Sequence, residues 1–135
     1  MSSVRISNRE RRGLDPSEHI EAKRFMAMVR MHEPRLPELK MLTHVPMGGW
    51  RNKVVAAKLK AEGAKAGYPD YLLDVPRGEF HGWRCELKTM TGRPSPEQKD
   101  WHDRLRSYGY KVDVCRGWDE AWAALKAYLA LDPPG

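Results

Sequence analysis

The stretch from residue 71 to residue 115 constrains the fold most, because apolar runs alternate there with turns and one strongly marked helix. Residues 71–75 and 79–88 are rich in strand-forming side chains, and the turn Pro76-Arg77-Gly78 separates them. Two strands that are joined by so short a turn pair side by side. This part of the sequence therefore predicts an antiparallel hairpin.

A helix and a third strand follow the hairpin. The helix is expected over residues 95–108, because Ser95 is a good capping residue and Pro96 suits the first helical position. The side chains expected to face the core from this helix are Trp101, Leu105 and Tyr108. A helix between two strands of one sheet implies a crossover, so the third strand, residues 110–115, is expected to lie parallel to its neighbour.

The remaining elements complete an α/β pattern with a mixed sheet flanked by helices. They are a helix over residues 15–31, a short strand over 39–45, a helix over 52–62 and a last helix over 119–131. Residues 15–131 are expected to form a single domain, and residues 1–14, which are rich in arginine, a flexible basic arm.

Composition limits the class of protein. The formal net charge is +6, which favours a polyanionic partner such as nucleic acid, although a solvated basic surface would give the same balance. No apolar run approaches the ~20 residues that span a bilayer. The N-terminus lacks a secretory signal, so we expect a cytoplasmic protein. Cys85 and Cys115 lie in apolar runs and are expected to be free core residues.

Three residues of the hairpin suggest chemistry. Asp70 precedes the first strand, while Glu86 and Lys88 lie near the end of the second strand and share one face because strand side chains alternate. Carboxylate oxygens are ligands that Mg²⁺ and Mn²⁺ prefer, and a lysine beside them can position or deprotonate a water. The alternative is that Glu86 and Lys88 form a solvated pair with no catalytic role.

Two further polar residues are expected to face the site formed by Asp70, Glu86 and Lys88. Gln98 lies on the sheet side of its helix, where it could reach a metal-bound water or a phosphate, or could bond back to Ser95 in a capping box. Glu18 lies one turn before Ala22 on the core side of the first helix. It could serve a cation or simply favour the helix start, and Glu21 is a rival for the same role.

The combined motifs resemble the VRR-NUC domain of the PD-(D/E)XK nuclease superfamily from about Ser17 to Leu129. The stretches that carry the resemblance are residues 17–19, 46–51, 57–70, 81–88, 92–98 and 109–112. The resemblance implies a restriction-endonuclease-like fold. It also implies that this chain is a nuclease.

The resemblance also assigns roles. Asp70 and Glu86 would bind the metal, with the Leu87 carbonyl as a further ligand, Lys88 would act on the nucleophile, and Glu18 would complete the site. Gln98 matches the glutamine of the following helix. The DNA-binding candidates are Arg51, Lys53, Lys58, Lys60, Lys65 and Arg93, with Arg77 and Arg84 nearby; each of these cations singly could be plain surface. Met47 stands where the family often has Asn, which weakens a DNA-contact role for that turn.

Compact members of this family resemble phage and bacterial proteins, so the resemblance implies a homodimer that nicks branched DNA such as Holliday junctions in a bacterial cell. Trp50 or Trp118 could form the dimer interface, whereas Trp122 is expected in the core. Two other functions stay open. One is a catalytically inactive DNA-binding accessory module, and the other is an RNA-directed or small protein-interaction domain.

Overall fold

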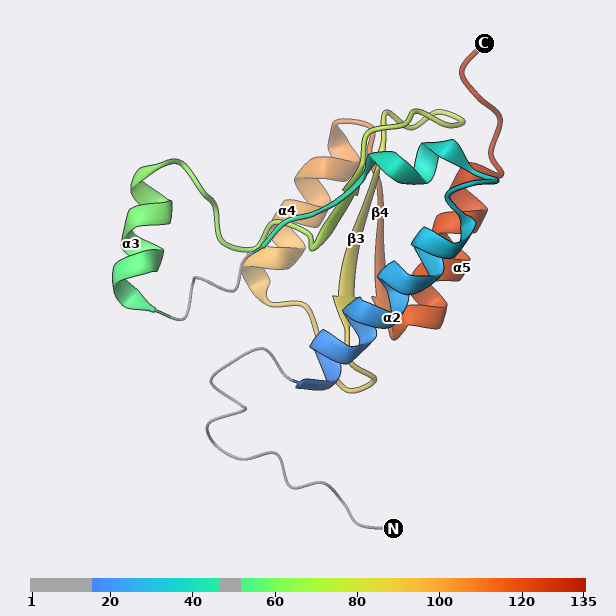
Figure 1. Ribbon diagram of the computed structural model, residues 1–135. Coiled ribbons are helices and arrows are strands. Elements are labelled where there is room, and N and C mark those ends of the chain that lie inside the picture. The colour runs from blue at the N-terminus through green and yellow to red at the C-terminus, as the bar shows by residue number, and fades with distance from the viewer. Residues whose placement is uncertain (1–15, 47–51) are drawn as a thin grey trace.

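The computed structural model describes residues 16–46 and 52–135. In chain order its elements are α2 (Pro16–His32), the 3₁₀ helix η1 (Pro37–Met41), β1 (Leu42–His44), α3 (Lys53–Ala61), β2 (Tyr71–Leu73), β3 (Trp83–Lys88), α4 (Pro96–Ser107), β4 (Lys111–Arg116) and α5 (Trp118–Leu129) (Figure 1). The arm expected over residues 1–14 lies outside the described residues, as do Met47, Trp50 and Arg51.

The described strands form one mixed sheet in the order β1-β2-β3-β4. β1 and β3 both run antiparallel to β2, whereas β4 runs parallel to β3, with Glu86 opposite Val114. The predicted hairpin and the predicted parallel crossover strand are therefore both confirmed. β3 lies inside the sheet, and its side chains from Trp83 to Leu87 are all buried.

Helices cover both faces of the sheet (Figure 1). α2 and α5 pack together on one face, where Phe25, Val29 and Leu125 form the centre of the core with Trp83. α4 lies on the opposite face, against β4. The outcome is the predicted α/β class with a mixed, helix-flanked sheet, and Trp122 is in the core as expected.

Several predicted boundaries were wrong. The strand expected over residues 39–45 is only three residues long, because Pro37 begins a 3₁₀ helix that occupies the preceding residues. The second hairpin strand begins at Trp83 and not at residue 79. Tyr108 was expected in the core but is 75% exposed. The side of α4 that faces the sheet carries His102, and it is not the side that the aromatic residues suggested.

The two cysteines are free and buried, as predicted. Within residues 16–46 and 52–135, no helix has the length and apolar character needed to cross a membrane.

Gly67 allows the segment before β2 to approach the start of α4. A Cβ atom at Gly67 would lie 2.9 Å from the backbone carbon of Glu97, and its φ is +91°. Gly63 has a similar φ of +100°, but a Cβ atom there would meet nothing within 4 Å. Both glycines have a positive φ angle, but only Gly67 is also closely packed, so comparing the two distinguishes the effect of backbone conformation from the effect of packing.

We predict that Gly63→Ala lowers the free energy of unfolding by about 1 kcal/mol, the conformational penalty alone. Gly67→Ala should lower it by at least about 2 kcal/mol more, because the new methyl group overlaps backbone atoms that cannot easily move. Urea unfolding of the two variants measures the difference. Equal losses would show that Gly67 is needed only for its φ angle.

Candidate active site

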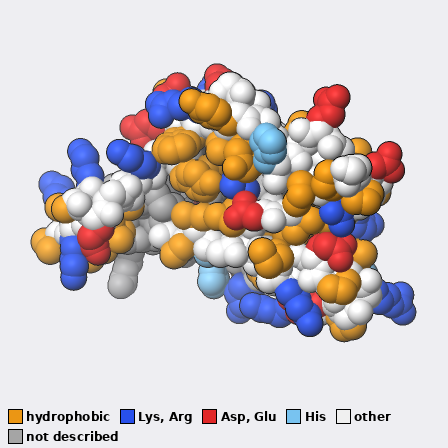
Figure 2. All heavy atoms as spheres, turned by 90° about the horizontal axis from the view of Figure 1, so that it is seen from above, with side chains coloured by type: hydrophobic (Ala, Val, Ile, Leu, Met, Phe, Trp, Pro, Cys, Tyr) orange, Lys and Arg blue, Asp and Glu red, His pale blue; other side chains and the backbone are white. Residues whose placement is uncertain are grey.

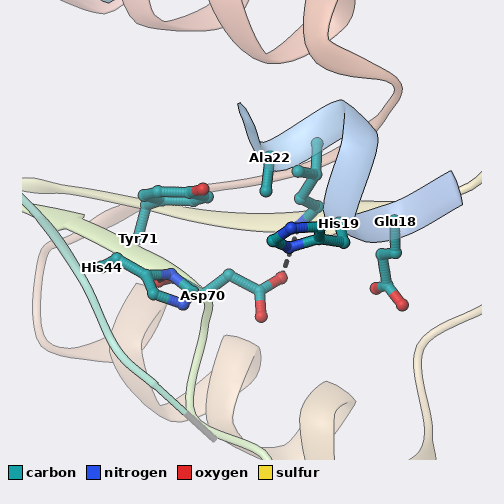
Figure 3. A pocket seen from close by; sticks show the side chains of 7 residues that line it. Glu18, His19, Ala22, His44, Asp70 and Tyr71 are labelled. Carbon is teal, nitrogen blue, oxygen red and sulfur yellow. Dashed lines mark hydrogen bonds between the residues drawn. The ribbon is translucent and has the colours of Figure 1, made fainter. Parts of the chain in front are cut away.

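The register of β2 and β3 brings two carboxylates together at one end of the sheet. Tyr71 pairs with Cys85, so Asp70, one residue earlier, lies opposite Glu86, one residue later. The Asp70 carboxylate extends to the next residue of β3, where its Oδ2 accepts a hydrogen bond of 2.8 Å from the Leu87 backbone N–H. The dashed line at the Asp70 carboxylate in Figure 3 marks this bond, although Leu87 carries no label there.

The Leu87 peptide faces the same place. In a strand the N–H and the C=O of one residue point to the same edge, so the Leu87 carbonyl is directed toward the side on which Asp70 lies. β2 begins only at Tyr71, which leaves this edge of β3 without a strand partner at Leu87 among the described residues. A backbone oxygen and the Asp70 carboxylate therefore share one corner of the sheet.

Glu86 is almost completely buried, with 1% of its surface exposed. α4 holds both of its oxygens: the Gln98 amide nitrogen donates to Oε2 at 3.3 Å, and His102 Nε2 lies 3.3 Å from Oε1. Gln98 and His102 are four residues apart, so they lie on one side of the helix. This burial contradicts the alternative of a solvated Glu86–Lys88 pair.

Gln98 takes part in both interactions that the sequence offered as alternatives. Its Oε1 accepts a bond of 2.8 Å from the Ser95 backbone N–H, and the Ser95 hydroxyl accepts one of 3.1 Å from the Gln98 N–H. Its amide nitrogen stays available for Glu86. The capping box thus fixes the side chain that reaches the carboxylate.

The two carboxyl groups are strongly perturbed. Burial, followed by the neighbouring charge of Glu86 and a hydrogen bond between the two groups, raises the pKa of Asp70 to about 8. The Leu87 N–H and the Lys88 ammonium oppose this rise. Burial also raises the pKa of Glu86, and Glu18 adds to the effect. Without a cation, the pair therefore retains a proton at neutral pH.

Glu18 and Glu21 have different surroundings. Glu18 lines a cavity of about 70 Å³ together with Asp70 and Leu87 (Figure 3). Glu21 instead accepts a bond of 2.7 Å from the Trp118 N–H at the start of α5, so its carboxylate stabilises that helix end. Of the two candidates, Glu18 is the one beside the carboxylate pair.

Comparisons with known proteins agree with this geometry. The family model of the VRR-NUC domain matches residues 14–119. A solved structure described as a VRR_NUC domain protein is 30% identical, with a TM-score of 0.68, and the match covers 82% of this chain and 89% of the other. The chain belongs to the VRR-NUC family. This is a family of nuclease domains, and a nuclease acts on nucleic acid.

A second solved structure, described as a VRR_NUC domain, shares the fold at 23% identity. Its TM-score is 0.50, and the match covers 80% of this chain and 97% of the other. Among curated proteins, no match to the chain was found.

The donor set of this VRR-NUC domain fits a hard divalent cation in an open site. No group of three or more His, Cys, Asp or Glu side chains within residues 16–46 and 52–135 is placed to hold a metal ion. Mg²⁺, however, is commonly bound through one or two carboxylates and keeps several waters. Asp70, Glu86 and the Leu87 carbonyl offer this kind of oxygen set, and a cation would stabilise the charged carboxylates, whose pKa values are raised chiefly by burial.

The cationic candidates fall into two groups. The first group lies on α3, which has no buried residue and stands away from the sheet (Figure 1): Lys53, Lys58 and Lys60 are exposed there. Figure 2 shows Lys and Arg side chains gathered around this helix. Lys65 and Arg93 are also exposed. In contrast, Arg77 pairs with Glu38, and Arg84 is buried between Asp74, Tyr68 and Tyr110. Arg77 and Arg84 therefore support the fold.

His102 is the site residue that the sequence analysis missed. The sequence signal was its position four residues after Gln98, but the aromatic residues Trp101 and Tyr108 suggested another buried face. Burial lowers the pKa of His102, so the neutral ring can donate one N–H to Glu86.

We predict that His102→Leu lowers the free energy of unfolding by about 1–3 kcal/mol, because one buried oxygen of Glu86 loses its partner. It should also weaken Mn²⁺ binding, whereas His102→Gln should preserve much of both. Urea unfolding and calorimetric Mn²⁺ titration measure these effects. His32→Gln is the control, since the His32 side chain bonds to the Met28 carbonyl of α2 and packs on Trp122. Unchanged Mn²⁺ binding in His102→Leu would exclude a positioning role.

Proposed function

We propose that this VRR-NUC protein is a Mg²⁺- or Mn²⁺-dependent endodeoxyribonuclease that hydrolyses phosphodiester bonds in branched DNA. The observation that carries the proposal is the carboxylate pair of buried Glu86 and half-buried Asp70, with Lys88 two residues beyond Glu86 on the same strand. Such a pair is unfavourable without a cation, so its presence calls for a function that uses one.

Each residue has a proposed part in the reaction. Asp70, Glu86 and the Leu87 carbonyl would hold the cation, with Glu18 beside them. When bound, the cation would polarise the scissile phosphate and lower the pKa of the attacking water. Lys88 would orient that water, help to remove its proton, or offset the negative charge that develops on the phosphate. Gln98 and His102 would keep Glu86 in position.

The exposed lysines of α3, with Lys65 and Arg93, would contact DNA phosphates. Such contacts fix the orientation of DNA without reading its sequence, which suits an enzyme selective for structure. Arg51 remains a candidate for the same role.

We also propose that the protein acts as a homodimer on Holliday junctions, in the cytoplasm of a bacterial cell that either encodes it or carries a phage that does. A four-way junction is nearly two-fold symmetric, and its resolution needs two matched nicks, which a two-fold dimer would supply. Trp118, offered as an interface residue, is partly buried and packs against the core, so it would contribute little surface.

Purified protein should nick a four-way junction in Mg²⁺ or Mn²⁺, and EDTA should abolish the nicking. Asp70→Asn and Lys88→Met should each lower kcat by about 100-fold or more, because each removes a group that acts on the metal or the nucleophile. Flap and linear duplex DNA are the comparison substrates. Lys126→Met, on the exposed side of α5, is the matched control and should keep full activity.

The products distinguish the parts of the proposal. Paired nicks in opposing strands support the dimer, whereas unpaired nicks indicate that protomers act singly. Binding without cleavage of any substrate would favour the accessory-module alternative. Cleavage that persists in Asp70→Asn would contradict the assigned site.

A further inference from the structure

A groove leads away from the carboxylate pair between α2 and the edge strand β1. It has a volume of about 710 Å³, and it shares His19, Ala22, His44 and Tyr71 with the small cavity beside Asp70. Because the two spaces have four lining residues in common, the groove is continuous with the candidate active site. A ligand in the groove would therefore extend to the reacting atoms.

The groove combines an apolar floor with a cationic rim. Met26 and Leu42 lie on the floor, while Lys23 and Arg30 are exposed side chains of α2 at its border. Among the described residues that line it, none is acidic. An apolar surface with cations beside it is the arrangement that proteins use to bind single-stranded nucleic acid, where bases contact the floor and phosphates contact the cations.

His44 lies where the groove meets the small cavity. Its Nδ1 donates a hydrogen bond of 3.0 Å to the Asp70 carbonyl, and its ring packs on Tyr71 with the centroids 5.0 Å apart. These two contacts fix an exposed aromatic ring beside the carboxylate. Figure 3 shows His44 and His19 on either side of the Asp70 carboxylate in that view. A fixed, exposed ring is a suitable surface on which a base can stack.

We propose that this groove binds an unpaired nucleotide of the substrate, directly beside the phosphate that is cleaved. The inference rests on the proposed nuclease function and names the feature of branched DNA that the site would recognise. Bases inside a duplex are stacked and paired, so they cannot reach an apolar floor. A strand that leaves the duplex at a flap, or at a branch point where pairing is lost, can place its first unpaired base there.

The test uses two DNA molecules: a duplex with a single-stranded arm whose first unpaired base is 2-aminopurine, and the same duplex with a blunt end. Binding is measured by fluorescence anisotropy in EDTA, so that it does not depend on a metal ion or on cleavage. The wild-type protein should bind the armed duplex about tenfold more tightly than the blunt one, as expected for stacking of one base. The 2-aminopurine emission should fall on binding.

Two variants and one matched control test the location. The double substitution Lys23→Ala and Arg30→Ala should remove most of the preference and make the salt dependence less steep. Ala27→Glu, which places a negative charge at an exposed position in the groove, should do the same. Arg24→Ala lowers the net charge by one, as Ala27→Glu does, at an exposed position of α2 that does not line the groove, so it should keep the preference.

No preference for the armed duplex, or the same loss in Arg24→Ala as in the groove variants, would overturn the proposal. Other outcomes test the proposed function separately. Armed-duplex binding without cleavage in Mg²⁺ or Mn²⁺ would contradict the nuclease and leave the groove supported. Cleavage with an unaltered preference in the groove variants would contradict the groove alone.

Discussion

The fold depends on a buried carboxylate near one end of its sheet. Glu86 lies in an interior strand of the sheet with 1% of its surface exposed, and such a group is tolerable only if its oxygens have partners. Gln98, His102 and Asp70 supply them from the other elements. The position of α4 relative to the hairpin is therefore tied to one side chain, and the close approach at Gly67 makes that position possible.

Local signals allowed much of this to be predicted. The capping box at Ser95 and the short hairpin turn depend on residues close in sequence, and both features are present. Asp70 and Glu86 were predicted to meet because strand alternation and hairpin pairing bring them together. The roles of these residues remain predictions, but their proximity follows from the register.

Other features could not be predicted, because they depend on packing between distant segments. α4 buries His102 and leaves Tyr108 exposed, because His102 is the residue that pairs with Glu86 of β3. The periodicity of the helix sequence alone contains no information about this partner. Glu21 is engaged by the start of α5, a contact across 97 residues of sequence. The groove is lined by residues of α2 and of the short strand β1, which are distant in sequence, and the sequence suggested a longer strand there.

The central claim is that Asp70 and Glu86 hold a proton that a divalent cation displaces. Calorimetric titration of Mn²⁺ into the protein at pH 7, in two buffers that differ in ionisation enthalpy, tests it directly. Because the pKa of Asp70 is raised to about 8, binding should release about one proton per ion, and the affinity should increase with pH until about pH 8. Asp70→Asn should abolish the release. Tight Mn²⁺ binding with no proton released at pH 7 would contradict the account.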